Sequence, residues 1–264
     1  MKLTVLGARG SMPVSGRQYM TYGSATSCYL IETETEAVYF DAGSGIVNTS
    51  NFKDKRISIF LSHPHLDHLL GLPFCPMLSE RDRNIVLYGM EKDDLSVRDQ
   101  VDHVFSQPAW PLHLVNYPAD LSYMGLKDKD RIILSDLSIS WERGNHPGDC
   151  LILKAEENGK SIVYATDYEH EKEADERLIS FASGADILIY DSQYDEEEYE
   201  SKRGYGHSTP EHGIGIFEKC KAKKLLFTHH DPFADDEMLN AAGKRYASVD
   251  PNVLFAREGD IFTV

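Results

Sequence analysis

The chain has 264 residues, 41% of them hydrophobic and 10% aromatic, a composition that excludes a disordered protein and predicts a globular one. Its formal net charge is −16, from 43 acidic and 27 basic residues, so its surface repels long polyanions unless a local basic patch compensates. No apolar run has the length that spans a bilayer, and the N-terminus lacks a signal-peptide pattern, so we expect a cytoplasmic protein without a membrane partner.

In chain order, short apolar and β-branched runs predict many strands with helices between them, which is typical of an α/β domain. The predicted strands cover residues 3–7, 28–33, 37–41, 57–61, 84–90, 131–140, 150–155, 161–167, 185–191, 224–229, 252–256 and 260–264. Helical patterns follow His68 and Pro210 and cover about residues 95–105, 172–181 and 235–246. Asn158-Gly159, between two of the strands, favours a hairpin turn with positive φ angles.

One segment interrupts this pattern. Residues from about Glu91 to Leu126 are rich in proline and aromatic side chains and have no clear period. We therefore expect a single domain over residues 1–264, with an insertion at about 91–126 that covers one face.

The four cysteines are widely separated and form no CxxC pair, so we expect buried, reduced thiols rather than disulfides or a cysteine zinc site.

Metal-capable side chains are concentrated directly after the predicted strand at 57–61. His63, His65, Asp67 and His68 lie within six residues, at spacings that can project from a strand end and the following turn toward one cavity. Neutral imidazoles offer nitrogen lone pairs, and carboxylates add the charge that holds a divalent cation. The sequence therefore predicts a metal site here, and the alternative is a polar loop.

The stretch His63-Pro64-His65-Leu66-Asp67-His68 resembles the HxHxDH signature of the metallo-β-lactamase superfamily. VYFDAGSGI resembles that superfamily's first motif, in which Asp41 would hydrogen-bond the metal-binding loop without being a ligand. Further along the chain, GNHPGD contains His146, YATD contains Asp167, and LFTHHD contains His229. Five motifs in the family's order are more specific than any one of them alone.

This resemblance implies a binuclear site bridged by Asp167 and a water or hydroxide. One metal would be held by His63, His65 and His146, and the other by Asp67, His68 and His229. Two divalent ions roughly 3.5–4 Å apart lower the pKa of a shared water toward neutrality. Zn²⁺ suits these ligands, and Mn²⁺ or Fe²⁺ would be held by the same set.

Several histidines have simpler interpretations. His146 lies in a turn where an exposed histidine needs no function, and His230 either lines the site or is exposed. His103, His113 and His170 match no motif, so we expect surface or packing positions for them.

Two later stretches resemble ribonuclease Z and related phosphodiesterases. ADILIYDSQYDEEE resembles a strand followed by His-Glu-Ala-Thr-Phe, with Asp191 in place of the glutamate, and YGHSTPEHG resembles the His-Ser-Thr motif. The resemblance implies that Asp191 orients His207, which protonates the leaving oxygen or binds phosphate, so the catalytic set is Asp67, Asp191 and His207. The alternative is helix capping, by Thr209 before Pro210 and by a capping box of Ser208 with Glu211.

By resemblance the fold is a four-layer αβ/βα sandwich with two mixed sheets, and the activity is that of a phosphodiesterase acting on small or cyclic phosphodiesters such as a cyclic nucleotide. The chain lacks the basic, glycine- and proline-rich arm with which ribonuclease Z grips transfer RNA, so a long nucleic acid is not the expected partner. The alternatives are a ribonuclease Z-like RNA endonuclease and a lactone or thioester hydrolase. An oxidoreductase is disfavoured because His65 occupies the position where flavin-coupled members of the superfamily carry an acidic residue. A non-catalytic scaffold is disfavoured because none of the expected metal ligands is missing. A homodimer is compatible with the sequence, which leaves the oligomeric state open.

Overall fold

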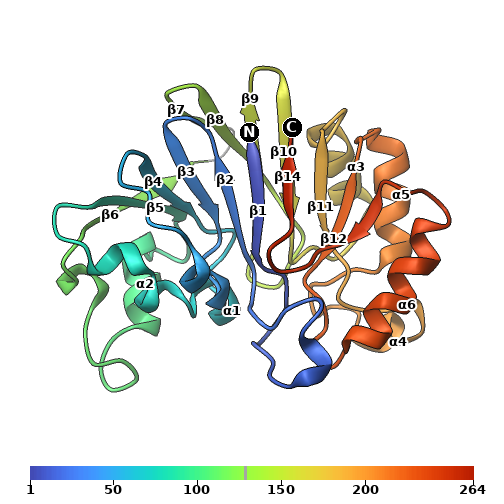
Figure 1. The fold of residues 1–264 in the computed structure, drawn as a ribbon, viewed down its shortest axis with the longest axis horizontal. Helices are drawn as coiled ribbons and strands as arrows, with labels where there is room; N and C mark the ends of the chain where they lie inside the picture. Colours follow the sequence, from blue (N-terminus) through green and yellow to red (C-terminus); the bar gives the residue numbers. More distant parts are fainter. Residues whose placement is uncertain (128–129) are drawn as a thin grey trace.

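The computed structural model describes residues 1–127 and 130–264, and it places their strands in two sheets of seven strands each, packed face to face (Figure 1). The first sheet has the order β14 (Ile261–Thr263), β1 (Lys2–Gly7), β2 (Cys28–Glu32), β3 (Glu36–Phe40), β4 (Arg56–Phe60), β5 (Asn84–Met90) and β6 (Asp120–Leu126). The second has the order β13 (Val253–Phe255), β12 (Leu225–Thr228), β11 (Ile187–Asp191), β10 (Lys160–Ala165), β9 (Leu151–Glu157), β8 (Leu137–Arg143) and β7 (Arg131–Leu134). Both sheets are mixed, because β3 to β6 and β10 to β13 run parallel while the remaining pairs are antiparallel.

Helices cover the outer face of each sheet, which completes the four layers (Figure 1). The α-helices are α1 (Leu66–Leu69), α2 (Val97–Val104), α3 (Lys172–Phe181), α4 (Glu196–Lys202), α5 (Pro210–Cys220) and α6 (Asp236–Ala247). The 3-10 helices are η1 (Arg17–Tyr19), η2 (Ser44–Asn48), η3 (Leu72–Phe74), η4 (Pro76–Ser79) and η5 (Leu114–Asn116). The predicted αβ/βα sandwich is therefore confirmed.

The alternation of side chains along β3 shows how one strand serves two cores. Val38 and Phe40 point into the layer between the sheets, whereas Ala37 and Tyr39 point toward the helical layer that includes α2. All four are fully buried, because successive side chains of a strand point to opposite faces and both faces are covered here. A third core lies between the second sheet and helices α3, α5 and α6. The predicted hairpin is present, with φ angles of 52° at Asn158 and 74° at Gly159 joining β9 to β10.

The segment 91–126, expected as an insertion, contributes to the first sheet. It contains α2 and ends in β6, which pairs with β5 in parallel over seven residues. The strand escaped prediction because it lies at the sheet edge and alternates buried Leu121 with exposed Asp120 and Ser122. Within this segment Trp110 packs edge-on against Phe74, at a centroid distance of 5.6 Å.

Among the described residues, no helix combines the length and the hydropathy that crossing a membrane requires.

The functional motifs lie at one edge of the sandwich, at or after the ends of β4, β8, β10, β11 and β12. In Figure 1 this is the lower edge, where α1 follows β4. The arrangement matches the general rule that ligands of α/β sheets bind beyond the carboxyl ends of the strands.

Candidate metal centre

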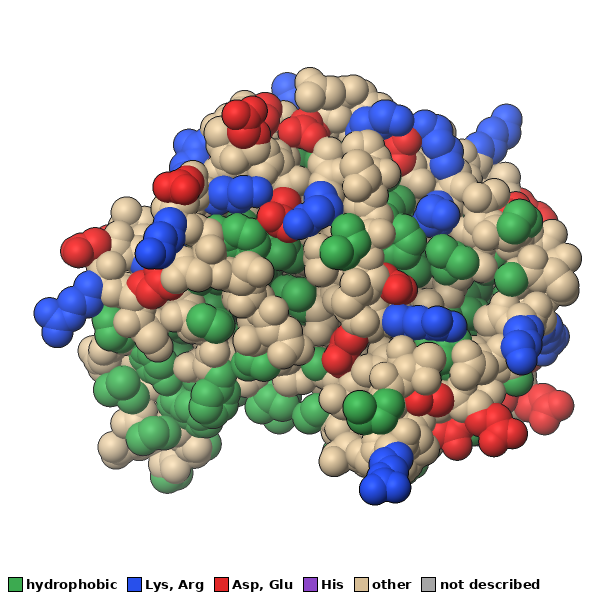
Figure 2. Space-filling model, in the orientation of Figure 1, with side chains coloured by type: hydrophobic (Ala, Val, Ile, Leu, Met, Phe, Trp, Pro, Cys, Tyr) green, Lys and Arg blue, Asp and Glu red, His purple; other side chains and the backbone are tan. Residues whose placement is uncertain are grey.

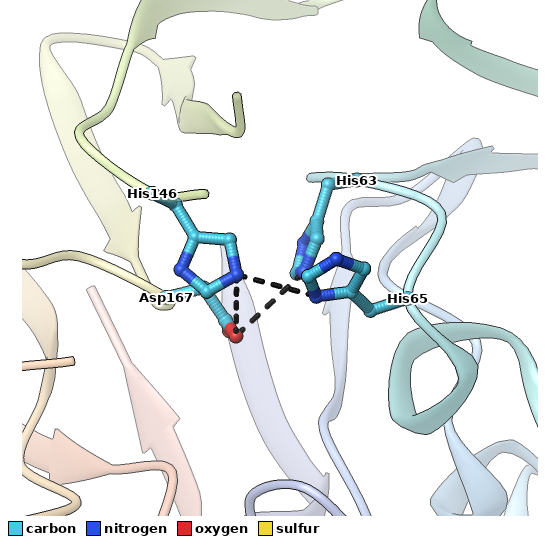
Figure 3. A group of neighbouring side chains, drawn as sticks. All are labelled: His63, His65, His146 and Asp167. Atoms are coloured by element: carbon cyan, nitrogen blue, oxygen red, sulfur yellow. Dashed lines mark hydrogen bonds and ion pairs between the residues drawn. The ribbon is translucent and has the colours of Figure 1, made fainter. Parts of the chain in front are cut away.

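Four side chains from three separate loops converge at the first group of donor atoms. His63 and His65 follow β4, His146 follows β8, and Asp167 follows β10; Figure 3 shows all four pointing toward one another. The Nε2 atom of His146 lies 3.2 Å from Nδ1 of His65 and 3.8 Å from Oδ1 of Asp167. Nε2 of His63 lies 3.7 Å from the same oxygen.

A second group lies against the first and shares Asp167. The Nε2 atom of His68 lies 3.2 Å from Oδ2 of Asp67 and 3.1 Å from Oδ2 of Asp167. The Nε2 atom of His229 lies 3.2 Å from each of these two oxygens. Asp167 thus presents Oδ1 to the first group and Oδ2 to the second. In each group the donor atoms lie within 4.8 Å of one another, as ligands of one ion must.

The imidazoles are oriented by hydrogen bonds from the nitrogen that faces away from the centre. His68 donates from Nδ1 to Oδ2 of Asp41 at 2.7 Å, and His146 donates from Nδ1 to the carbonyl of Gly206 at 2.9 Å. His63 Nδ1 lies 3.1 Å from the Ser62 hydroxyl, which itself donates to Asp41. With Nδ1 carrying the proton, Nε2 presents a lone pair to the centre, which is the tautomer that a metal-bound histidine needs.

Asp41 has the supporting position that the first motif predicts. Its buried carboxylate accepts hydrogen bonds from the Ser62 amide at 2.7 Å and from the Tyr164 hydroxyl at 2.8 Å, in addition to those from His68 and the Ser62 hydroxyl. It therefore fixes the start of the His63–His68 loop from behind.

Three supporting contacts escaped the sequence analysis. Gln193 Oε1 accepts a hydrogen bond from Nδ1 of His229 at 2.8 Å, the Ser11 amide donates to Oδ2 of Asp67 at 2.9 Å, and the Gly206 carbonyl holds His146. Gln193 lies within the stretch that resembles the phosphodiesterases, but no local pattern links it to His229. Two of the three contacts use backbone atoms, which no side-chain pattern reports.

The charge balance of the site follows from two buried carboxylates surrounded by imidazoles. Burial lowers the pKa of His63 well below the ordinary 6.5 and also lowers the pKa of His146, so burial disfavours the charged form of both rings. Burial also opposes a proton on His229, but the charge of Asp167 and the hydrogen bond to Asp67 outweigh it and raise the pKa of His229 to about 9. Burial raises the pKa of Asp167, whereas His229, His68 and His63 together hold it well below its usual range. The carboxylates thus draw positive charge into the centre.

The donor set fits a pair of divalent cations. The Nε2 atoms of His63 and His68 are buried and make no hydrogen bond, although both face carboxylate oxygens. A buried polar atom without a partner is uncommon, and a cation between the imidazoles and carboxylates would satisfy these atoms. His65 is exposed, so the centre is reached from that side.

Asp191 and His207 lie beside this centre as a hydrogen-bonded pair. Nδ1 of His207 lies 3.0 Å from Oδ2 of Asp191, and the His207 ring stacks on that of His229 with centroids 4.8 Å apart. Asp191 is fully buried and also accepts hydrogen bonds from the amides of Asp167, Gln193 and Ser208. His207 is buried, with 8% of its surface exposed.

The helix cap and the remaining histidines differ in part from expectation. Thr209 caps α5 by accepting from the His212 amide, whereas Ser208 turns inward to the Tyr190 hydroxyl at 2.9 Å, so the predicted capping box of Ser208 with Glu211 is wrong. His230 neither lines the site nor is exposed, because it is buried behind the centre and donates to the Ala256 carbonyl at 2.9 Å.

The three histidines that match no motif, together with His212, lie outside the cluster. His103 contacts the Asp99 carbonyl on α2, His113 faces Asp102, and His170 stacks on His212.

Comparison with known sequences identifies relatives along most of the chain. The sequence profile described as "Beta-lactamase superfamily domain" matches residues 36–230. A ribonuclease Z of Limosilactobacillus reuteri is 24% identical, with 87% of this chain and 87% of the relative aligned. A ribonuclease Z of a Synechococcus strain is 23% identical, with 98% and 97% aligned.

Comparison with solved structures shows the same fold. The metallo-beta-lactamase fold protein YhfI from Bacillus subtilis superposes with a TM-score of 0.73 at 20% identity, covering 99% of this chain and 98% of that one. A diphosphatase of the PhnP family gives 0.73 at 20% identity, covering 100% and 97%. The short form of human tRNase Z gives 0.70 at 19% identity, covering 100% and 99%.

Proposed function

The chain belongs to the beta-lactamase superfamily and is a metal-dependent hydrolase, and from this premise we propose that it hydrolyses small or cyclic phosphodiesters at a binuclear centre. The observation that carries the proposal is the division of Asp167 between two donor groups, with Asp191 and His207 beside them. Curated relatives named ribonuclease Z and a structural neighbour named a diphosphatase support phosphoryl chemistry.

We propose that His63, His65 and His146 hold one metal, that Asp67, His68 and His229 hold the other, and that Asp167 lies between them. Two divalent cations held there, Zn²⁺ by preference and Mn²⁺ or Fe²⁺ as alternatives, supply Lewis acidity and bring the pKa of a water toward neutrality. We also assign Asp67 to the catalytic set, as the carboxylate that faces both His68 and His229 and would help to hold the second cation.

His207 would act on the leaving group. Because its Nδ1 donates to Asp191, its Nε2 is the atom that can carry a proton to the leaving oxygen as the phosphorus–oxygen bond breaks. Asp191 holds the ring in that orientation. An alkoxide leaving group needs this proton, so the pair matches the chemistry of a nucleoside or alkyl diester.

The preference for a compact substrate rests on charge. With a net charge of −16, the surface offers little to neutralise the further phosphates of a polymer. On the face drawn in Figure 2, Lys and Arg side chains are scattered among carboxylates rather than gathered in a patch. The alternative, a ribonuclease Z-like endonuclease, is favoured by the names of the curated relatives, and a lactone or thioester hydrolase by the fold alone.

Location and assembly are further parts of the proposal. Four buried, unpaired cysteines support a cytoplasmic protein. Whether the protein forms a homodimer is a question for solution measurements of mass.

The test is a comparison of kcat/KM for metal-loaded protein at near-physiological salt. The substrates are cyclic mononucleotides, dinucleotides, precursor transfer RNA, single-stranded RNA, a lactone and a thioester. We expect turnover of at least one small diester to exceed that of both RNAs. Efficient RNA cleavage that falls steeply with salt, together with negligible turnover of every small diester, would favour the ribonuclease.

A further inference from the structure

A buried carboxylate outside the donor set lies two residues beyond Asp167. Glu169 is 8% exposed, and its two oxygens accept backbone hydrogen bonds from one turn: Oε1 from the Gly204 amide at 2.7 Å and Oε2 from the Gly206 amide at 2.9 Å. The Tyr199 hydroxyl donates to Oε1 at 3.3 Å. A carboxylate that accepts two amides of one turn fixes the place of that turn.

The turn held by Glu169 contacts the proposed centre at two points. The carbonyl of Gly206 accepts the hydrogen bond from Nδ1 of His146, and the next residue in the chain is His207. Gly206 has a φ of +94°, and a Cβ there would lie 2.0 Å from Nδ1 of His146. The backbone therefore approaches the imidazole as closely as only glycine permits.

The main chain of Glu169 provides a second link to the same histidine. Its amide donates to the carbonyl of Asn145 at 2.9 Å, and the Asn145 side-chain amide donates to the carbonyl of Glu169 at 2.9 Å. Asn145 directly precedes His146. Glu169 therefore supports His146 in two ways, through the main chain next to His146 and through the turn whose carbonyl contacts the His146 ring.

We propose that Glu169 is a positioning residue that sets His146 and His207 through the Gly204–Gly206 turn. This inference rests on the proposed function, in which His146 is a ligand of one metal and His207 is the proton donor. It predicts that loss of the Glu169 carboxylate weakens the binding of one of the two metals and slows the departure of a poor leaving group. The second metal should be little affected, because the described contacts of the Glu169 side chain include none of Asp67, His68 and His229.

The experiment compares wild type, Glu169→Gln and the control Glu173→Gln, which alters an exposed carboxylate on α3. The glutamine keeps the shape but places an NH₂ group opposite one of the two amides. Zinc affinity is measured by chelator competition. The kcat and KM are measured with bis(p-nitrophenyl) phosphate and with a dinucleotide, and Tm reports whether each variant folds.

In Glu169→Gln we expect one zinc equivalent to bind about 10- to 100-fold more weakly, as is usual for loss of a partner that orients a ligand, while the other equivalent is retained. The kcat should fall more for the dinucleotide, whose leaving group needs a proton, than for the nitrophenyl ester, with KM little changed. If the variant does not fold, Tyr199→Phe, which removes only the hydroxyl that donates to Oε1 of Glu169, is expected to give the same pattern at smaller size.

Two results would overturn the inference. One is a folded Glu169→Gln variant whose two zinc affinities and two kcat values all lie within about twofold of wild type. Such a change is smaller than the usual effect of losing a residue that orients a metal ligand. The other is equal weakening of both equivalents. A wild-type protein that binds no zinc pair or cleaves no diester would instead reject the proposed function.

Discussion

The imidazole Nδ1 of His207 lies 3.0 Å from Oδ2 of Asp191, and this same oxygen accepts the amide of Asp167 at 2.9 Å. One carboxylate thus links the proposed proton donor to the residue that faces both donor groups. This carboxylate is fully buried and ties the position of the His207 ring to that of Asp167.

Replacing His207 by alanine should retain both metals and slow turnover of a poor leaving group by a factor of roughly 10² to 10⁴, the usual contribution of general acid catalysis. A nitrophenyl ester needs little protonation and should lose much less. Asp191→Asn should act in the same direction, because the ring loses its orienting charge. Steady-state kinetics on the two ester types checks this, with the exposed His103→Ala as control. Equal rates for wild type and His207→Ala on a dinucleotide would leave His207 without a catalytic role.

Asp41→Asn should weaken metal binding about 10- to 100-fold, because an amide cannot accept from His68, Ser62 and Tyr164 together. Leaving buried donors unsatisfied should also lower the free energy of unfolding by about 1–3 kcal/mol. Tyr164→Phe removes one of these hydrogen bonds and should have the smaller effect. Chelator competition and urea unfolding measure the two quantities, and unchanged zinc affinity in Asp41→Asn would contradict the orienting role.

Metal analysis should find two transition-metal ions per chain in wild type. Asp167→Ala removes both oxygens that face the two groups, so at least one ion should be lost on dialysis and activity should fall. Elemental analysis of dialysed protein, together with activity after adding back metal, checks this. A single ion in saturated wild type, with full activity in Asp167→Ala, would remove the binuclear proposal.

Asp186 should give stability that is lost in acid. Burial raises its pKa, but hydrogen bonds from Lys223, the Ser161 amide and Lys160 outweigh burial and hold the pKa below the ordinary 3.8. Because the unfolded chain binds this proton more tightly, the contribution is fully present above the unfolded pKa and disappears as the pH falls through the folded one. The side chains of Lys160 and Lys223 are 46% and 62% exposed, so we expect about 1 kcal/mol at most from each pair.

The measurement is Tm against pH for wild type, Asp186→Asn and the exposed control Asp54→Asn. Asp186→Asn should have the lower Tm at pH 7 and approach wild type near pH 3. A difference in Tm that stays constant over this range would assign the effect to packing rather than charge.

The sequence by itself determined the local features. The buried strands, helices α2, α3, α5 and α6, and the hairpin at Asn158-Gly159 follow from periodicity and turn chemistry, which act over a few residues. The His63–His68 group was also evident, because its members are neighbours in the chain. The edge strand β6 was missed, since its half-exposed pattern lacks the apolar run that marks the inner strands.

Only the tertiary structure decided which distant groups meet and which atoms face the centre. His229 reaches Asp67 across 162 residues of chain, and Asp167 directs one oxygen to each donor group. The neighbouring histidines His229 and His230 make different contacts, one with Asp67 in the centre and one with the Ala256 carbonyl, and His229 has a left-handed φ of 58° directly after the end of β12. The hydrogen bonds of Glu169 end on the backbone amides of Gly204 and Gly206, whose positions depend on how the chain folds rather than on residue type.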